Sequence, residues 1–546
     1  MFESSKIKEL LNGIKEKRPD FNDKSIEASY SFLKKQLKEL PVRDRKRILS
    51  ETLNIASALI EIDPRPEIIA AGLLFNFAET APDALNKIKH ACAADIYLLT
   101  KAHCFAKKMA ADHNLDFRHF SATAYYLAEM KLTVQVVAAG FLHNLLSPIY
   151  NVANVVTIKQ EFGQEIAEML ENYQKISNLK PLKTARHVED LRQMLIAFAK
   201  DPRVILIKLC SLLDIVKNID AIPQHKREEA AKEALDVFAH IADLLGIWRL
   251  RWQLEDYAFK YLMPQEYAKI EKHFNVDERK NREKYIYKTA QIVQKACRAL
   301  GITAEINGRF KHFYSIHLKM KNKNKPFDEI CDVFALRIIV NNVDECYRVL
   351  GIIHGIWKPK NRRFKDYIST PKENGYRALH TVVFGLNSRM TEFQIRTREM
   401  DEEAKYGIAS HWYYKNQPEK TPLWIRELID QQQYYATPEE FLENVSTKLL
   451  IKKIYTYTPK GDIIDLPEGA TPVDFAYAVH TELGNKMSSA KLNGVPVPLN
   501  MKINTGDVIE IVIDEKQIGP KPEWLNFAKT PFARKQIEKF IENQST

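Results

Sequence analysis

The spacing of apolar residues changes once along this chain, and the change separates parts of different architecture. Up to about residue 270, apolar residues recur three and four positions apart, as in Leu191, Met194 and Leu195, which is the period of an amphipathic helix. After about Gly301 the period becomes two, which is typical of strands. This alternation covers three segments: residues 332–340, 381–385 and 391–395. We therefore expect a helical part, then a mixed part, with the charged stretch 275–284 as the junction.

A third part follows. Helical spacing returns at residues 401–414 and 438–449, and residues 454–513 are rich in Gly, Pro and Asn turns, which predicts a small β-rich module with one helix at 472–481. A basic tail, residues 520–546, is expected to end in a helix. A chain of 546 residues suits three or four domains.

Composition limits the class of protein. The chain is 45% hydrophobic and 28% charged, and its most apolar stretch, residues 134–146, is interrupted by polar residues, so we expect no membrane span. The N-terminus lacks the apolar segment of a secretory signal. Six cysteines occur without a CxxC pair, which argues against a disulfide scaffold or zinc ribbon and for a cytoplasmic protein.

The excess of basic residues is concentrated in two segments. The net charge is +11. Residues 308–325 hold six Lys or Arg and no acid, and residues 357–365 hold five more and no acid. One such run could be a solvated face, but two runs beside strand-like segments favour an anionic ligand.

One short motif is repeated. Residues 70–76 (AAGLLFN) match residues 138–144 (AAGFLHN) at an offset of 68, and Ala56 and Leu59 fall on Ala124 and Leu127 at the same offset. We interpret this as a duplicated helical unit.

Two carboxylates on strand-like segments suggest a metal site. Alternation places Glu392, Gln394 and Arg396 on one face of a strand, with Phe393 and Ile395 on the other. Asp332 opens a second strand-like segment. Carboxylates from neighbouring strands suit Mg²⁺, which keeps one or two of them together with phosphate oxygens. Taken singly, Asp332 is better interpreted as a strand-edge residue that only meets solvent; it is the combination with Glu392 and the basic runs that favours a metal site.

The central region closely resembles the synthetase domain of the RelA/SpoT homologue family of alarmone enzymes. The resemblance rests on five motifs in order: residues 308–316 (GRFKHFYSI), 364–368 (FKDYI), 374–380 (NGYRALH), 393–397 (FQIRT) and 407–412 (GIASHW). It implies a domain that transfers pyrophosphate from ATP to the 3′-hydroxyl of GDP or GTP.

The resemblance assigns roles by position. Asp332 and Glu392 would be catalytic and bind Mg²⁺, and Glu392 would help to deprotonate the attacking hydroxyl. Three residues would hold ATP: Arg309, Lys311 and Arg337. Six would hold the guanosine nucleotide, with Tyr376 stacked on guanine: Lys365, Lys372, Asn374, Tyr376, His380 and Gln394.

The helical part resembles the family's HD-type hydrolase domain, with metal ligands missing. His119 and His143 occupy two expected His positions, but Asn144 and Ser211 stand where Asp ligands are expected. Ser147, followed by Pro148, replaces the acidic pair that activates water. We expect no Mn²⁺ here, because the anionic donors are gone, and therefore no hydrolysis.

Residues 455–480 resemble a TGS domain, a β-grasp module. The resemblance implies contact of His480 with uncharged tRNA, and through it with the ribosome; a plain helix-capping role for His480 is the alternative. Long family members continue with further helical, zinc-binding and ACT-like regions. Nothing here corresponds to them, so we expect a naturally short chain or part of a longer one.

Together these observations predict a multidomain α and α+β protein with an all-helical HD-type domain, a mixed β-sheet nucleotidyltransferase-like synthetase domain and a small β-grasp (TGS) module. The expected parts are residues 1–105 (helical, a degenerate repeat), 106–270 (HD-type), 271–425 (synthetase), 426–452 (helical linker), 453–515 (TGS) and 516–546 (basic tail). The expected function is synthesis of guanosine tetra- or pentaphosphate in the stringent response. The alternative is a catalytically quiet regulatory or RNA-binding homologue.

Overall fold

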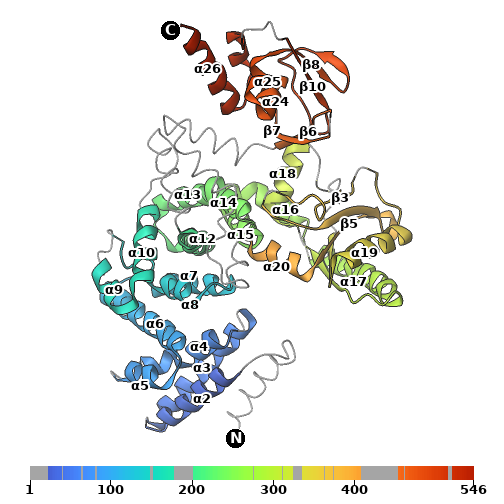
Figure 1. The fold of residues 1–546 in the computed structure, drawn as a ribbon. Coiled ribbons are helices and arrows are strands. Elements are labelled where there is room, and N and C mark those ends of the chain that lie inside the picture. The colour runs from blue at the N-terminus through green and yellow to red at the C-terminus, as the bar shows by residue number, and fades with distance from the viewer. Residues whose placement is uncertain are drawn as a thin grey trace. The chain divides into compact units, whose positions relative to one another are not determined.

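The computed structural model divides the chain into two compact units, residues 1–181 with 197–422, and residues 182–196 with 423–546 (Figure 1). It describes residues 23–39, 41–62, 65–79, 83–147, 152–177, 201–274, 276–309, 311–323, 327, 335–361, 363–372, 374–407, 453–459, 461–514 and 519–545. None of its described helices is both long enough and apolar enough to cross a bilayer.

The first half of unit 1 is helical, as the spacing predicts. Its elements are α2 (Lys24–Leu37), α3 (Val42–Ile62), α4 (Pro66–Ala78), α5 (Ala84–Ala91), α6 (Ala94–Asp112), α7 (Phe117–Glu129), α8 (Val134–Leu142), α9 (Val155–Phe162), α10 (Gln164–Ser177), α12 (Pro202–Lys217), η1 (Ile219–Ala221), α13 (Gln224–Glu233), the π-turn η2 (Ala234–Phe238), α14 (Ala239–Leu244), α15 (Trp248–Leu262) and α16 (Pro264–Lys272). We call these elements the helical half.

The repeated motif has the same packing in both copies. Gly72 on α4 lies against the side chain of Leu59 on α3, and Gly140 on α8 lies against Leu127 on α7, where an added Cβ would come within 2.6 Å of that side chain. Both contact pairs are related by the offset of 68 residues, and the first five residues of each motif are buried. The shared glycine contact supports a duplicated helix pair.

The second half of unit 1 is built on a five-stranded sheet. Its elements are α17 (Val276–Ala299), β1 (Glu305–Arg309), α18 (Phe313–Lys323), β2 (Ala335–Val340), α19 (Val343–Ile356), β3 (Lys365–Asp366), β4 (Leu379–Phe384), η4 (Leu386–Ser388), β5 (Met390–Thr397) and α20 (Arg398–Tyr406). The strand order is β1-β2-β5-β4-β3. Only β2 and β5 pair in parallel, so the sheet is mixed, as predicted.

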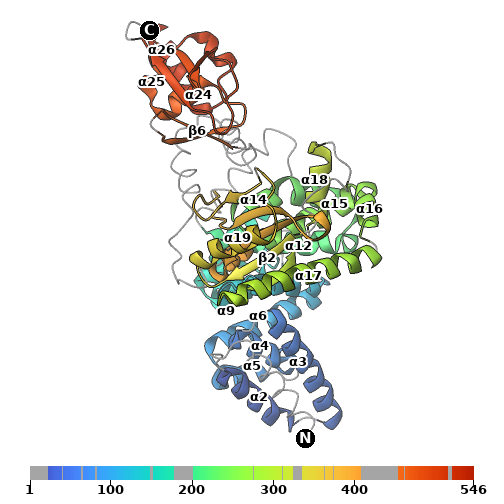
Figure 2. The same ribbon diagram turned by 90° about the vertical axis from the view of Figure 1, so that its right-hand side faces the viewer.

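One face of this sheet forms a core with two helices, α17 and α19, and Figure 2 shows α17 running along the sheet. Phe393 and Ile395 of β5 are fully buried in that core, whereas Glu392 and Gln394 face the opposite side, where the cavity described below opens. The predicted alternation of β5 is therefore confirmed. It places the core residues and the cavity residues of this strand on opposite faces of the sheet.

Two predicted boundaries are refined. The charged stretch 275–284 is helical, because α17 begins at Val276 and runs through it, so the change from the helical half to the sheet half falls at the start of the stretch, after α16. The stretch contains no Gly or Pro, and its Glu, Lys and Arg residues favour helix. The helix expected at 401–414 begins at Arg398, and α20 ends at Tyr406, before Gly407 with φ 54°; residues 408–414 lie outside the described residues, as does the predicted helix at 438–449.

Unit 2 contains the small module and the tail. Its elements are β6 (Lys453–Tyr457), β7 (Ile463–Pro467), α24 (Pro472–Val479), α25 (Thr481–Asn485), β8 (Met487–Leu492), β9 (Val495–Val497), β10 (Ile509–Ile513), η5 (Pro522–Asn526) and α26 (Pro531–Ser545). The tail packs onto α24 through Trp524 and Ile537. Buried Asp474 fixes this arrangement, because its carboxylate accepts hydrogen bonds from the backbone N–H groups of Lys529 and Thr530.

Candidate functional site

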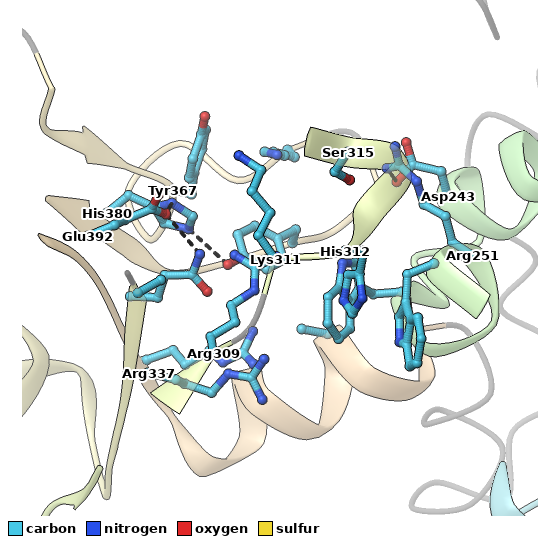
Figure 3. A pocket seen from close by; sticks show the side chains of 18 of the residues that line it. Asp243, Arg251, Arg309, Lys311, His312, Ser315, Arg337, Tyr367, His380 and Glu392 are labelled. Carbon is cyan, nitrogen blue, oxygen red and sulfur yellow. Dashed lines mark hydrogen bonds and ion pairs between the residues drawn. The ribbon is translucent and has the colours of Figure 1, made fainter. Parts of the chain in front are cut away.

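A cavity of about 410 Å³ lies between the open face of the sheet and the helical half (Figure 3). Ten Lys or Arg side chains line it, against four Asp or Glu. Such an excess of positive charge in a concave site attracts and concentrates anions. The two basic runs of the sequence supply five of these ten cations: Arg309, Lys311, Lys319, Arg363 and Lys365.

A chain of three side chains occupies one end of the cavity. His380 Nδ1 on β4 lies 3.2 Å from Glu392 Oε1 on β5, and His380 Nε2 lies 2.9 Å from the Tyr376 hydroxyl. Gln394 also donates to Glu392 Oε1, at 2.9 Å. The strands bring these residues together because Gln394 is paired with His380 across the β4–β5 ladder.

The protonation states of Tyr376, His380 and Glu392 follow from the surroundings of these side chains. Burial raises the pKa of Glu392, but contact with His380, Gln394 and Arg309 outweighs burial and lowers it to about 2. Burial lowers the pKa of His380, so its ring is neutral at pH 7. A neutral ring that donates from Nδ1 to Glu392 accepts at Nε2 from Tyr376, whose pKa burial raises. Glu392 is therefore a fixed carboxylate.

The loop 372–376 presents Tyr376 to the cavity. Gly375 has a φ of 76°, which a residue with a Cβ rarely adopts. Asn374 Oδ1 accepts from the Tyr376 backbone N–H at 3.2 Å, and Asn374 Nδ2 donates to the backbone oxygen of Asp243 at 3.1 Å. Lys372 Nζ lies 5.2 Å from the centroid of the Tyr376 ring. Both ends of the Asn374 side chain therefore have protein partners.

Three arginines lie beneath the cavity, on three neighbouring strands: Arg309 of β1, Arg337 of β2 and Arg396 of β5. Burial lowers the pKa of Arg309, and burial together with the other arginines lowers that of Arg337 to about 10. Asp401 of α20 lies 2.5 Å from Arg396 and 3.6 Å from Arg337. The Nε atoms of all three arginines are buried and have no hydrogen-bond partner among the described residues. The carboxylate of Asp401 therefore lies near two of these three arginines.

Lys311 adds a further cation to this group. Burial lowers its pKa to about 8, and the nearby Arg309 charge acts in the same direction. In Figure 3 its side chain extends between the end with Glu392 and the end with Asp243. Lys and Arg outnumber Asp and Glu in the cavity lining by ten to four. Burial costs a charged group free energy of hydration, and a bound polyanion would improve the charge balance.

The helical half forms the other wall. Trp248 on α15 lies under the guanidinium groups of Arg309 and Arg337, at 5.1 and 5.9 Å from the ring centroid. Trp252, one turn later, stacks on His312 at 4.2 Å. Asp256 accepts from the backbone N–H groups of Phe313 and Tyr314 at the start of α18. The helical half therefore contributes directly to the site.

Most of the predicted synthetase residues meet here. Ten line the cavity: Arg309, Lys311, Arg337, Lys365, Lys372, Asn374, Tyr376, His380, Glu392 and Gln394. Asp332 lies outside the described residues, so its pairing with Glu392 stays a prediction. The sequence reasoning did not assign Arg396, Trp248 or Arg251 to the site. The alternation of β5 placed Arg396 on the same face as Glu392 and so could have indicated its role. No pattern in the sequence pointed to Trp248 or Arg251.

Three of the residues predicted for a degenerate hydrolase site, His119, His143 and Ser211, also come together. His119 Nε2 lies 3.2 Å from both His143 Nε2 and Ser211 Oγ. His119 Nδ1 contacts Asp214 at 2.6 Å, and His143 Nδ1 contacts the backbone oxygen of Gly140. Asn144 and Ser147 follow in the turn after α8. Over the described part of the chain, no three His, Cys, Asp or Glu residues are grouped to hold a metal ion, and neutral Ser and Asn donors suit Mn²⁺ poorly.

In unit 2, His480 is exposed at the start of α25, where its Nδ1 accepts from the Glu482 backbone N–H at 3.3 Å. The capping role considered for His480 is thus present in the structure.

Three family models match the chain. Residues 308–419 match the region found in RelA/SpoT proteins, residues 96–248 match an HD domain, and residues 454–513 match a TGS domain. The first match contains the described site residues of the sheet, and the second contains Trp248.

Curated relatives carry names of both activities. The chain is 42% identical over 426 residues to a guanosine-3′,5′-bis(diphosphate) 3′-pyrophosphohydrolase of Aquifex aeolicus, which covers 77% of this chain and 60% of that protein. It is 37% identical over 468 residues to a GTP pyrophosphokinase of Myxococcus xanthus (82% and 61%). It is 38% identical over 433 residues to the bifunctional (p)ppGpp synthase/hydrolase SpoT of Escherichia coli (78% and 61%).

The matched region spans about 60% of the length of these relatives. The three family regions occur in the order that the sequence motifs predict, and the relatives are RelA and SpoT proteins. The chain belongs to the RelA/SpoT family.

Proposed function

We propose that this chain synthesises guanosine tetra- or pentaphosphate by transferring the β,γ-pyrophosphate of ATP to the 3′-hydroxyl of GDP or GTP. The observation that carries the proposal is one fixed carboxylate, Glu392, in a cavity lined by ten cations. Phosphoryl-type transfer needs aligned reactants and neutralised charge more than it needs covalent chemistry from the protein. The names of the pyrophosphokinase and synthase relatives point to the same reaction.

On the acceptor side, the Tyr376 ring would stack on guanine. Its hydroxyl is held by His380, which fixes the orientation of the ring. A base would take the place over the ring that Lys372 now occupies at 5.2 Å. Lys372 and Lys365, exposed beside the cavity, would then pair with the phosphates of the guanosine nucleotide.

On the donor side, Arg309, Lys311 and Arg337 would bind the phosphates of ATP. Burial depresses the pKa of each of these cations. A triphosphate supplies the negative charge that the site lacks, and charge-assisted hydrogen bonds to buried donors are the strong ones. The unpaired Nε atoms of Arg309 and Arg337 are donors available for such bonds.

Glu392 fits a Mg²⁺ site. Within the described residues, its contacts with His380 and Gln394 both use Oε1, and its pKa of about 2 keeps it ionised. Mg²⁺ binds to one or two carboxylates together with phosphate oxygens, and Asp332 would be the second. The ion would neutralise developing charge on the transferred group. A carboxylate of such low pKa is a weak base, so Glu392 itself would orient the attacking hydroxyl by accepting its hydrogen bond.

We propose further that the HD domain has lost hydrolase activity. Asn144 and Ser211 offer neutral oxygens in place of carboxylates, and Ser147 cannot activate water as an acidic residue would. His119 lies close enough to contact both His143 and Ser211. The domain would then act as scaffold.

The TGS module would bring uncharged tRNA, and through it the ribosome, to the enzyme. Exposed His480 is the contact we propose. Its capping bond uses only Nδ1, so Nε2 is available to an RNA phosphate or base.

The test is to incubate the protein with ATP, Mg²⁺ and GDP or GTP, with and without ribosomes and uncharged tRNA, and to resolve the nucleotides. We expect AMP and a pyrophosphorylated guanosine nucleotide in equal amounts. No product under any condition would favour the catalytically quiet homologue. A second incubation with guanosine tetraphosphate and Mn²⁺ should release no pyrophosphate.

A further inference from the structure

The turn between α14 and α15 is pressed against the acceptor side of the cavity. Two helices end there in glycines with positive φ: α14 ends before Gly246 (φ 68°), and α20 ends before Gly407 (φ 54°). A Cβ on Gly407 would come within 2.6 Å of the Gly246 carbonyl carbon and 2.8 Å of the Ile247 nitrogen. The neighbouring atoms are backbone, which cannot rotate away, so only glycine permits this approach.

The same turn holds the loop that carries Tyr376. A Cβ on Gly246 would lie 3.0 Å from the backbone oxygen of Asn374. The Asn374 side chain donates to the backbone oxygen of Asp243, and its other end accepts from the Tyr376 backbone N–H. Asn374 therefore joins the helical half to the residue that would stack on guanine.

A second contact, outside the cavity lining, ties the helical half to α20. Lys131, in the turn between α7 and α8, lies 2.7 Å from Glu402 of α20, and both side chains are largely buried. Neither residue lines the cavity. Ala404, two residues after Glu402 on α20, does line the cavity. Asp401 on the same helix pairs with Arg396 beneath the cavity.

An apolar cluster adds to this attachment. Phe259 and Ile270 of the helical half share one core with Ile316 of α18. The helical half is thus attached to the second half of unit 1 through α18 as well as through α20.

We propose that residues 243–247 and the Lys131–Glu402 pair are positioning elements of the synthetase: the helical half holds the 372–376 loop so that Tyr376 receives the guanosine nucleotide. The proposal rests on the synthetase function proposed above. It gives the HD domain a role in synthesis that does not depend on its hydrolase residues.

The first test compares Gly407→Ala with Gly301→Ala. Gly301 has a similar φ of 69°, but nothing lies within 4 Å of a Cβ there, so it carries the backbone strain without the collision. We expect Gly407→Ala to raise the KM for GDP or GTP by about 10- to 100-fold, because small displacements of a binding group have effects of that size. The KM for ATP should change much less, and Gly301→Ala should leave both values near wild type.

The second test reverses the charge of each member of the Lys131–Glu402 pair. Recovery in the double variant would show that the single variants act through the lost ion pair and not through misfolding. Lys131→Glu and Glu402→Lys should each raise the KM for the guanosine nucleotide several-fold, and the double variant should recover most of the loss. The affinity for a fluorescent GDP analogue, measured without ATP, should follow the same order.

The outcomes separate the two proposals. If wild-type protein makes no product, the synthetase proposal fails. If wild-type protein is active and the Gly407 and Lys131 variants match it, or are more active, the positioning proposal is overturned. Equal effects on the KM of ATP and of the guanosine nucleotide, or no recovery in the double variant, would also overturn it.

Discussion

His380 Nδ1 lies 3.2 Å from Glu392 Oε1, and this contact joins the one cavity carboxylate on β5 to the Tyr376 hydroxyl through a single imidazole. The strand pairing makes the contact possible, because β4 places His380 directly across from Gln394, two positions away from the pair Val382 and Glu392 on the same face. The carboxylate is thereby kept ionised, and the tyrosine ring is kept in one orientation. In the proposed reaction, binding of the acceptor and binding of the metal ion would be coupled through His380.

Replacing Glu392 with Gln should abolish synthesis. The amide keeps the size of the side chain but removes the negative charge that would bind Mg²⁺ and orient the hydroxyl. We expect the rate to fall by at least about 10²-fold, with a melting temperature near that of wild type. The control is Glu305→Gln on β1, an exposed glutamate outside the cavity, which should keep full activity. Equal activity of the two variants would contradict the assignment of Glu392.

Replacing His380 with Ala should make synthesis sensitive to acid. His380 and Gln394 lower the pKa of Glu392, whereas burial raises it. Without His380 that pKa rises from about 2, so the carboxylate becomes protonated, and activity is lost, at a higher pH than in wild type. Rates between pH 5 and 8 would show this. His354→Ala, which removes a contact with Thr381 on the core side of the sheet, should not shift the profile. An unchanged acid limb in His380→Ala would refute the coupling.

Restoring carboxylates should restore metal binding in the helical half. Ser211 Oγ lies 3.2 Å from His119 Nε2, beside His143. The double variant Asn144→Asp with Ser211→Asp would add two anionic donors to two imidazoles, a set that suits Mn²⁺. Electron paramagnetic resonance should detect bound Mn²⁺ in the double variant but not in wild type. Tight Mn²⁺ binding by wild type would show that the site is not degenerate.

Replacing His480 should reduce stimulation by uncharged tRNA. Two substitutions distinguish contact from capping, because Asn is a good N-cap and Ala is a poor one. If the imidazole contacts RNA, both His480→Ala and His480→Asn lose stimulation while synthesis without tRNA continues. If His480→Asn retains stimulation, the residue serves only to cap α25.

The sequence predicted those parts of the site that depend on local pattern. The period-two spacing of β5 separated Phe393 and Ile395 from Glu392 and Gln394, because the pleat of a strand enforces it. No local pattern could show that Trp248 lies beneath Arg309, because only tertiary packing brings together these two residues, which are about 60 positions apart in the sequence. The pattern did not show that the charged stretch 275–284 is helical, since charge indicates exposure and not the absence of a helix. Asp332 stays a prediction.

The most direct test of the central claim is ³¹P NMR of the products formed from ATP and GDP or GTP, by wild type and by Glu392→Gln in parallel, with ribosomes and uncharged tRNA present. We predict that wild type forms AMP and, in equal amount, a guanosine nucleotide with a pyrophosphate on its 3′-oxygen, and that Glu392→Gln forms neither. Absence of that product with wild type, or its undiminished formation by Glu392→Gln, would contradict the account.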